Sequence, residues 1–212
     1  MVYKEMNFSF GILTDNSSPQ RIAEIIKSIR DLNIPKYEIM IICGDKIEED
    51  HDVRHIPFDE TIKWAWVTKK KNVLAAEATY DNVVIFHDYY VFDKDWYKNY
   101  LTFGEDWDVC SNAQLLINGK RHFTDWVCWD SPIFPRYTSL AYHDWSHTKH
   151  MYQSGGYMLV KKQLMAKCPW NEEFGWGTAE DVEWSLRMRD IANWKCNGSS
   201  IVKHNKVHRD AQ

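Results

Sequence analysis

The amino-acid sequence predicts one α/β domain whose central sheet is mostly parallel and carries helices on its faces. Two patterns predict it: an apolar run, an amphipathic helix and a second apolar run follow one another over residues 8–42, and a helix leads into another apolar run over residues 68–86. Two strands joined through a helix lie parallel, because the chain returns to the same end of the sheet before the second strand begins. A chain of 212 residues can bury one such core but is too short for two substantial domains.

The first unit begins with residues 8–13, an apolar run that ends at a polar turn. Ser18 followed by Pro19 is typical of a helix N-cap and a first helical position. Isoleucines with helical spacing then predict an amphipathic helix with one buried stripe: Ile22, Ile25, Ile26 and Ile29. Residues 38–42 are the second apolar run and complete a strand–helix–strand unit.

The second unit starts with a predicted helix over residues 68–79, which turns Leu74 and two alanines inward and carries three lysines near its start. Residues 83–86 are Val-Val-Ile-Phe, a continuous apolar run that predicts a strand buried on both faces. The run stops at His87-Asp88-Tyr89, where the polarity of the sequence changes abruptly.

The second half of the chain predicts hairpins. Asn118-Gly119 between residues 109–117 and 120–129 is a strong signal for a two-residue β-turn, and Asn197-Gly198 suggests a similar turn near the end of the chain.

Between these hairpins, residues 130–152 form a long aromatic and basic loop. Loops of this length are usually functional or mobile, so we expect both properties here. A strand over residues 158–160 and a helix over residues 179–189 follow it.

Composition limits the classes of function. A net charge of −4 argues against non-specific nucleic-acid binding, which needs a surplus of basic residues on one face. The 11 Trp, 11 Tyr and 9 Phe largely fill a core, but they are also compatible with recognition of sugars or bases.

Five cysteines without a Cys-x-x-Cys pair argue against a disulfide framework or zinc site and predict a reducing compartment. With no signal-peptide-like start and no apolar stretch of about 20 residues, we expect a cytoplasmic protein without a membrane span.

Acidic residues follow three of the predicted strands: Asp15, Asp45 and Asp88. Ligands of open parallel sheets bind beyond the carboxyl ends of the strands. Aspartate is common in turns for local reasons, so any one of these residues is explained equally well by turn formation. Three acids at one edge favour a site, and Asp88 beside His87 offers the carboxylate and imidazole ligands that Mn²⁺ accepts.

At His87-Asp88-Tyr89-Tyr90 the sequence resembles the inverting family 2 glycosyltransferases, which have the GT-A fold. Their fourth strand ends in a short acidic motif, often Asp-x-Asp, that holds a metal ion and the nucleotide. The second carboxylate of that motif is absent here. The resemblance implies that Asp88 binds Mn²⁺ or Mg²⁺ with the donor diphosphate, and that a late histidine completes the metal shell, with His204 the first candidate and His208 the second.

The resemblance also implies donor contacts in the first half. Thr14 and Asp15 end a segment similar to the one that contacts the nucleoside. Asp45 stands where the family places an acid against the base, often uracil. Lys71 and Asn72 resemble the segment that reaches the ribose and the diphosphate.

Lysines at a helix start oppose the helix macrodipole, and a phosphate ligand would explain their presence there. For Lys69 and Lys70 a solvated basic turn is an equal alternative.

The second half carries Ser154-Gly155-Gly156-Tyr157 and, later, Trp176-Gly177 with Glu180-Asp181. This order resembles the paired glycines and the Trp-Gly…Glu-Asp motif of family 2 and of galactosyltransferases. It implies that Gly155 and Gly156 allow close backbone approach to the donor, and that Trp176 and Tyr157 contact the acceptor.

The same motif implies that Asp181 is the general base for the acceptor hydroxyl, with Glu180 binding acceptor or sugar. Thr178-x-x-Asp181 also fits a capping box, in which Asp181 would only start a helix. Both interpretations stay open on the sequence alone.

The resemblance covers about residues 8–189, and residues 105–153 match poorly. It implies one GT-A domain over residues 1–212, with a nucleotide-sugar-binding half up to about residue 104 and an acceptor-binding, catalytic half from about residue 105.

The predicted function is transfer of a sugar from a nucleotide-diphosphate donor such as a UDP-sugar to an acceptor hydroxyl, with inversion. The basic and aromatic residues of segment 120–152 suit a glycan or, as a minority alternative, a hydroxymethylated base in DNA. Two other functions stay open: a non-catalytic sugar- or nucleotide-binding module, and a nucleotidyltransferase. The second is disfavoured because residues 12–21 contain no glycine.

Overall fold

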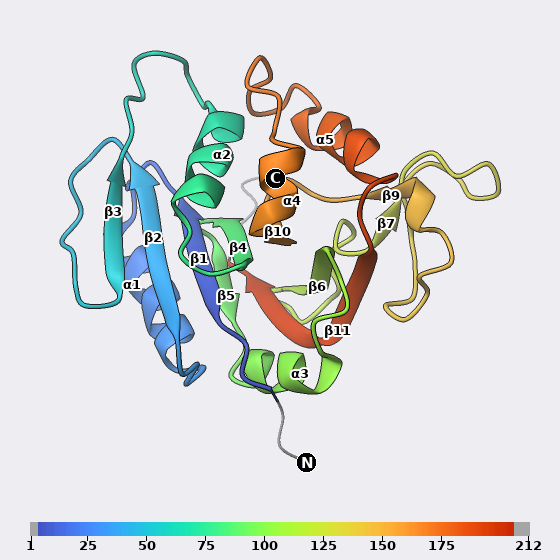
Figure 1. Cartoon of the computed structure of the whole chain (residues 1–212), viewed down its shortest axis with the longest axis horizontal. Helices are drawn as coiled ribbons and strands as arrows, with labels where there is room; N and C mark the ends of the chain where they lie inside the picture. The colour runs from blue at the N-terminus through green and yellow to red at the C-terminus, as the bar shows by residue number, and fades with distance from the viewer. Residues whose placement is uncertain (1–3, 206–212) are drawn as a thin grey trace.

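The computed structural model describes residues 4–205. An eight-stranded sheet runs through both halves of the chain in the order β3-β2-β1-β4-β10-β6-β11-β5 (Figure 1). Its strands are β1 (Phe8–Leu13), β2 (Tyr37–Cys43), β3 (Val53–Pro57), β4 (Asn82–His87), β5 (Tyr90–Phe92), β6 (Val109–Leu116), β10 (Tyr157–Lys161) and β11 (Trp194–His204).

Helices cover both faces of this sheet. On one face lie α1 (Pro19–Arg30) and α3 (Trp96–Phe103), which share a core cluster with Phe8 and Phe10. On the other face lie three helices that share the second core cluster: α2 (Val67–Glu77), α4 (Lys162–Lys167) and α5 (Glu180–Met188). The α/β architecture that the sequence predicted is therefore confirmed.

The first four strands of the sheet, β3, β2, β1 and β4, are parallel neighbours. Strand β10 is antiparallel to both β4 and β6, β11 is parallel to β6, and β5 is antiparallel to β11. All six residues of β1 are buried, as a strand covered on both faces requires. Gly11 lets helix α2 approach closely, because a Cβ there would lie 3.0 Å from the side chain of Leu74. Nearer the start of α2, Lys70 Nζ donates to the carbonyl oxygen of Thr14, the residue after β1, at 3.2 Å.

The hairpin predicted at Asn118-Gly119 forms only as a turn. Gly119 has a positive φ of 76°, and the Leu116 N–H donates to the Lys120 carbonyl oxygen at 2.8 Å. Residues 120–129 do not continue as the second strand; one bridge joins Leu115 to Arg121, and the chain then leaves β6. The prediction was therefore right about the turn and wrong about the strand.

The hairpin predicted at Asn197-Gly198 is wrong. Strand β11 runs on through this point beside β6, with a bulge between Asn197 and Ile201. The Asn197 side chain accepts the N–H groups of Ser199 and Ser200, so it satisfies the backbone of a bulge rather than that of a turn.

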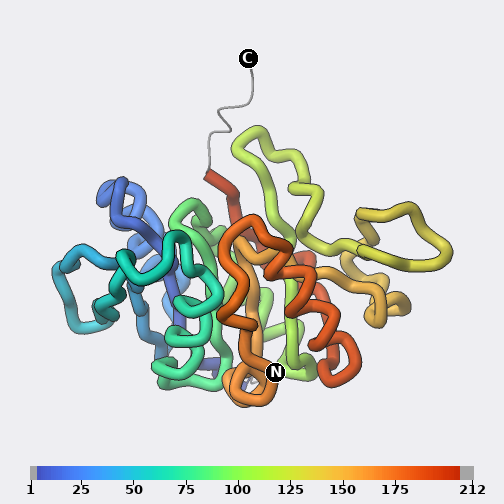
Figure 2. Tube along the Cα trace, turned by 90° about the horizontal axis from the view of Figure 1, so that it is seen from above, coloured from blue at the N-terminus to red at the C-terminus, as the bar shows by residue number. Residues whose placement is uncertain are grey.

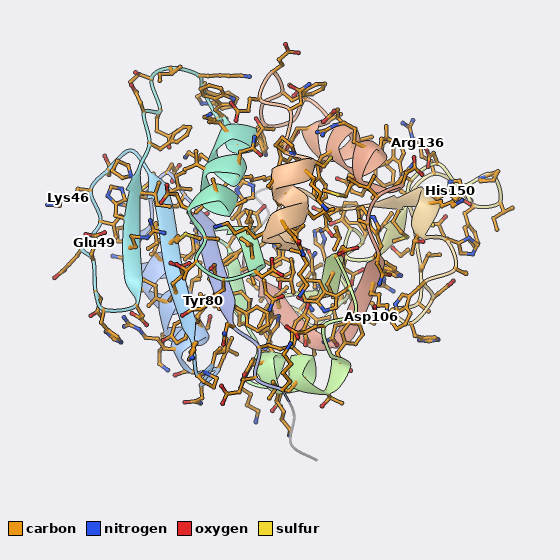
Figure 3. All side chains as sticks on the ribbon, in the orientation of Figure 1. Lys46, Glu49, Tyr80, Asp106, Arg136 and His150 are labelled. Atoms are coloured by element: carbon orange, nitrogen blue, oxygen red, sulfur yellow. The ribbon has the colours of Figure 1, made fainter. Side chains whose placement is uncertain are left out.

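Segment 130–152 is mostly loop, as expected, and it contributes two short strands to a second sheet. The strands of this sheet, β7 (Val127–Cys128), β8 (Thr138–Ser139) and β9 (Met151–Tyr152), pair in the order β8-β7-β9, and a short 3₁₀ helix, η1 (Thr148–His150), precedes β9. Figure 2 shows this yellow part of the chain projecting from one side of the molecule, and Arg136 and His150 lie on it (Figure 3). The mobility of this segment stays a prediction.

Across residues 4–205, none of the helices combines the length and the apolar character needed to cross a bilayer.

Candidate active site

A cleft of about 310 Å³ opens beyond the carboxyl ends of β1 and β4, at the position where open α/β sheets bind ligands. Five of the residues singled out from the sequence line it: Thr14, Asp15, His87, Asp88 and Trp176. The remaining lining residues are Leu13, Ser17, Arg21, Trp64, Ala65, Val67, Lys70 and Tyr89.

Asp88 is held against the end of β1. Its N–H donates to the carbonyl oxygen of Leu13 at 3.2 Å, and its Oδ2 accepts the Thr14 hydroxyl at 2.8 Å. Burial raises the pKa of Asp88, the hydrogen bond from Thr14 opposes that shift, and the charge of Asp15 adds to it. A cation bound to this carboxylate would relieve the cost of its burial.

His204 is the last residue of β11, and it is not among the residues that line the cleft of Asp88. It is in register with Tyr90 of β5, and its ring centroid is 4.7 Å from that of Tyr89, the residue after Asp88. A carboxylate oxygen and an imidazole nitrogen are a ligand set that Mn²⁺ accepts, so Asp88 and His204 fit a metal in chemical type. His208, the second candidate, lies outside the described residues.

A second group of candidate metal ligands lies elsewhere. Within residues 4–205, the three side chains whose ligand atoms are close enough to hold one ion are Asp50, His51 and Asp52. They precede β3 and therefore lie at the opposite end of the parallel strands from Asp88.

Asp181 lies in the first turn of α5, with its carboxylate facing β9 and the glycine pair. Its Oδ2 accepts the Tyr152 hydroxyl at 2.5 Å and the Gly155 N–H at 3.1 Å. Burial raises the pKa of Tyr152 far above its usual range, so this hydroxyl stays a donor to the carboxylate. The partial positive charge at the start of a helix stabilises a carboxylate there.

The capping-box alternative for Asp181 is wrong. The residue at the N-cap is Ala179, in the left-handed region with φ 62°, and it makes no side-chain capping hydrogen bond. The Thr178 hydroxyl instead exchanges hydrogen bonds with the backbone of Gly175. The Asp181 side chain accepts the Val182 N–H through Oδ1 at 3.0 Å, but it forms no reciprocal cap with Thr178.

Gly155 and Gly156 connect Asp181 to the cleft. Gly155 donates to Asp181, while the carbonyl oxygen of Gly156 accepts the His87 N–H at 3.0 Å. A Cβ on Gly156 would lie 2.9 Å from the Tyr89 hydroxyl, so a side chain at this position would displace a residue of the cleft. One dipeptide thus spans from the carboxylate on α5 to the end of β4.

Glu180 and Tyr157 are both buried, with different consequences. Burial raises the pKa of Glu180, and the nearby charge of Lys71 opposes that shift. Tyr157 is fully buried in the core and donates from its hydroxyl to Asn112. The expectation that Tyr157 contacts an acceptor is therefore wrong, because Tyr157 of β10 packs in the core beside Phe86.

Of the lysines at the start of α2, Lys70 is the one that lines the cleft. It forms an ion pair with Glu60 and donates to the carbonyl oxygen of Thr14 at 3.2 Å. Lys71 points away from the cleft lining into the core, 3.7 Å from the centroid of the Trp170 ring. The sequence could not separate these neighbours, because only packing shows which side chain faces the strand ends.

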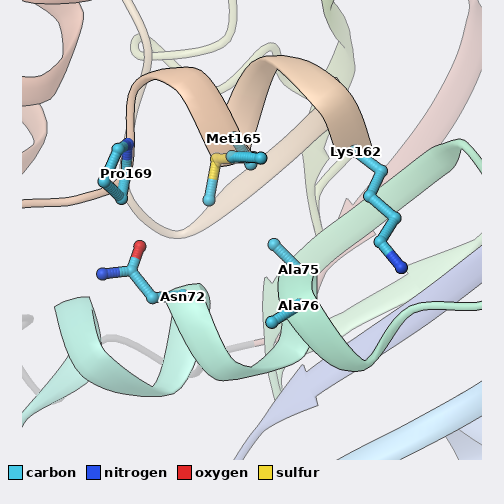
Figure 4. A pocket seen from close by; sticks show the side chains of 7 residues that line it. Asn72, Ala75, Ala76, Lys162, Met165 and Pro169 are labelled. Carbon is cyan, nitrogen blue, oxygen red and sulfur yellow. The ribbon is translucent and has the colours of Figure 1, made fainter.

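Asn72 lies away from that cleft. Its amide donates to the Trp170 carbonyl oxygen and accepts the Trp170 N–H, at 2.9 and 2.8 Å. It lines a separate small pocket between α2 and α4, together with Met165 and Pro169 (Figure 4). This placement does not agree with the expected contact of Asn72 with ribose and diphosphate.

Asp45 follows β2 at the carboxyl end, as expected, and its side chain is exposed. It is not among the residues that line the cleft of Asp88, so its contact with a base stays a prediction.

Sequence reasoning missed Trp64, which is 78% exposed and lies edge-to-face with Trp176, 56% exposed, at 6.2 Å between ring centroids. The loops that carry them are tied together, because the Trp176 N–H donates to the Ala65 carbonyl oxygen and Lys63 donates to three carbonyl oxygens of residues 172–174. The sequence offered only a tryptophan that follows the mostly polar residues 59–63, and its exposure is visible only in the structure.

Comparison with known proteins bears on the fold. No family model and no curated protein matches the sequence. Among solved structures, TarS 1-349 of S. aureus in complex with UDP-GlcNAc has a TM-score of 0.65 at 15% identity; the match covers 95% of this chain and 59% of that one. GalNAc-T7 with UDP, GalNAc and Mn²⁺ has a TM-score of 0.69 at 12% identity, covering 93% and 43%. This chain is thus shorter than either neighbour.

Both neighbours are GT-A-type glycosyltransferases, and the shared architecture extends over nearly all of this chain. The cleft, the paired glycines and the start of α5 accordingly lie on a GT-A fold.

Proposed function

We propose that this protein is a glycosyltransferase that moves a sugar from a UDP-sugar to an acceptor hydroxyl, with inversion at the anomeric carbon. The observation that carries the proposal is the connection between Asp181 and the cleft: Gly155 donates to the Asp181 carboxylate, and Gly156 accepts from His87, the residue before Asp88. A base and a diphosphate site joined by one dipeptide suit a single-displacement reaction.

In this reaction the acceptor oxygen forms a bond to the anomeric carbon while the bond from that carbon to the diphosphate oxygen breaks. The leaving diphosphate keeps the electron pair of the broken bond. Asp181 takes the proton of the acceptor hydroxyl, since a hydroxyl is a weak nucleophile until its proton is removed. Tyr152 and Gly155 orient the carboxylate through their hydrogen bonds to Oδ2.

On the donor side, Thr14, Asp15 and Asp45 are assigned to the nucleoside, and His87 and Asp88 to the diphosphate. Asp88 with His204 would hold Mn²⁺ or Mg²⁺, which neutralises charge that develops on the leaving group. The neighbours support this assignment to the extent that they were solved with UDP-GlcNAc and with UDP and Mn²⁺. Gly155 and Gly156 allow the backbone to approach the donor.

On the acceptor side, Trp176 offers an exposed ring in the lining of the cleft, and we assign Glu180, buried at the start of α5, to the acceptor or the sugar. We keep a glycan as the favoured acceptor and a modified nucleobase in DNA as the minority alternative, because the net charge of −4 opposes DNA binding. Five buried, unpaired cysteines support the proposed cytoplasmic location.

A panel of nucleotide-sugars, each with Mn²⁺ or with EDTA, tests the proposal by thermal unfolding. At a concentration about 100 times Kd, a ligand stabilises a protein by about 2.7 kcal/mol, which is a shift of roughly 5–10 °C for a domain of this size. We expect such a shift for a UDP-sugar with Mn²⁺ and a smaller shift for the same UDP-sugar with EDTA. In a separate assay without acceptor, we expect slow hydrolysis of that donor. Binding without hydrolysis or transfer would instead indicate a non-catalytic binding module.

A further inference from the structure

Lys71 has the lowest solvent exposure of the charged residues in the described part of the chain. Its side chain is fully buried, and its Nζ has no hydrogen-bond partner within the described part of the chain. Its contact is with the face of Trp170, 3.7 Å from the ring centroid, a cation–π arrangement. A buried ammonium that donates no hydrogen bond is costly, so its presence calls for an explanation beyond packing.

The ammonium lies beside the proposed base. A Cβ built on Gly155 would be 3.0 Å from Lys71 Nζ and 3.5 Å from Asp181 Oδ2, so both atoms border the same small space next to Gly155. Glycine at this position leaves that space open. Any larger residue would push the ammonium or the carboxylate out of place.

The charged groups that face Lys71 come from one helix terminus. Glu180 and Asp181 of α5 both favour its charged form, while burial disfavours it and lowers the pKa of Lys71 to about 8. Tyr152 of β9 adds a neutral hydroxyl donor to the same Asp181 oxygen. Glu180 and Asp181 are adjacent carboxylates, and the charge of Asp181 raises the pKa of Glu180 while that of Lys71 lowers it.

We propose that Lys71 is a positioning residue for the reaction: its buried ammonium lies beside Glu180 and holds the Asp181 carboxylate across Gly155, without itself binding the donor. The proposal rests on the proposed role of Asp181 as base. It replaces the expected contact of Lys71 with the diphosphate, because Lys70 and not Lys71 lines the cleft.

Lys71→Met, which keeps the length of the stem and removes the charge, tests this proposal with three measurements. Calorimetry with UDP and Mn²⁺ should give an unchanged Kd. The kcat for transfer should fall about tenfold or more, since small misplacement of a reacting group is costly, and the acidic limb of its pH profile should move to higher pH. NMR titration of the Glu180 carboxyl should show a midpoint at higher pH than in the wild type.

Lys69→Met is the matched control, since Lys69 is the same residue type two positions earlier and pairs with Glu172 at the surface. It should leave all three measurements at wild-type values. Lys71→Arg, which keeps the charge, should retain the wild-type midpoint of Glu180.

Two outcomes overturn the proposal. A weaker Kd for UDP with unchanged kcat would make Lys71 a donor ligand, and an unchanged Glu180 midpoint with unchanged kcat would make it a packing residue.

Asp181→Asn, measured alongside, separates failure of the Lys71 proposal from failure of the proposed function. If Asp181→Asn transfers sugar at the wild-type rate, or if the wild type transfers none, the proposed function fails, while the Glu180 titration still decides the role of Lys71.

Discussion

Two groups of charged residues lie at opposite ends of the same parallel strands and differ in how their charges are paired. At the amino end, before β3, Arg30 binds both Asp50 and Asp52, and the Tyr37 hydroxyl donates to Asp52 at 2.7 Å. Each of the four carboxylate oxygens accepts a hydrogen bond, from Arg30, Tyr37 or His51. Hydrogen bonds from His51 lower the pKa of Asp50 to about 2.

At the carboxyl end the charges are less completely paired. Burial raises the pKa of both Asp88 and Glu180, and the ammonium of Lys71 has no hydrogen-bond partner in the described structure. The first group has the spacing of metal ligands, but hydrogen bonds from Arg30, Tyr37 and His51 already occupy its carboxylate oxygens. Sites that bind and react are expected where buried charges lack a full set of partners, so the comparison favours the second group.

The largest effect on kcat is expected for Asp181, and no residue of the amino-end group should match it. Asp181→Asn should lower kcat by about 10²–10⁴-fold, because the amide cannot take the proton of the acceptor hydroxyl. The Kd for UDP with Mn²⁺, measured by calorimetry, should stay at the wild-type value. Transfer within a few-fold of wild type would remove Asp181 as the base and make Glu180 the next candidate.

The second prediction compares the two groups as binding sites for the metal ion. Asp88→Ala should abolish the tightening of UDP binding by Mn²⁺, an effect of roughly 100-fold, because His204 alone cannot hold a hard cation without a carboxylate. Asp50→Ala, the matched change in the group with metal-ligand spacing, should leave that tightening intact. If the two variants behave the other way round in calorimetry, the metal belongs to Asp50, His51 and Asp52.

Lys71 should lower the stability of the fold. Its pKa falls from 10.5 to about 8 on burial, so the cost of burying its charge is present below pH 8 and disappears as the pH rises from 8 to 10.5. Lys71→Met should therefore stabilise the protein at pH 7 by about 3 kcal/mol in urea unfolding, with a smaller gain at pH 10. A loss of stability at pH 7 would show that its attraction to Glu180 and Asp181 exceeds the cost of burial.

The smallest effect concerns the amino-end group. Hydrogen bonding from Arg30 lowers the pKa of Asp52, so its ion pair stabilises the fold above the unfolded pKa and this contribution is lost as the pH falls through the folded pKa. Asp52→Asn should cost about 0.5–1 kcal/mol at pH 7, with a smaller difference from wild type at pH 3. Its kcat should equal that of the wild type; a slower variant would link this group to the reaction.

The sequence alone determined much of the parallel half. The isoleucine spacing of residues 22–29 and the apolar run of residues 83–86 each specify their element through periodicity or length, without reference to distant residues. The acids after β1, β2 and β4 therefore lie at one edge, because parallel strands end at the same side of a sheet.

The tertiary structure decided the rest. Whether Lys70 or Lys71 faces the cleft depends on how α2 packs against Gly11, and Tyr157 is a core residue because β10 inserts between β4 and β6. The hydrogen bond from Tyr152 to Asp181 joins residues 29 positions apart. Contacts such as these form only when separate segments pack together, and no local pattern of residue types encodes which side chains will then meet.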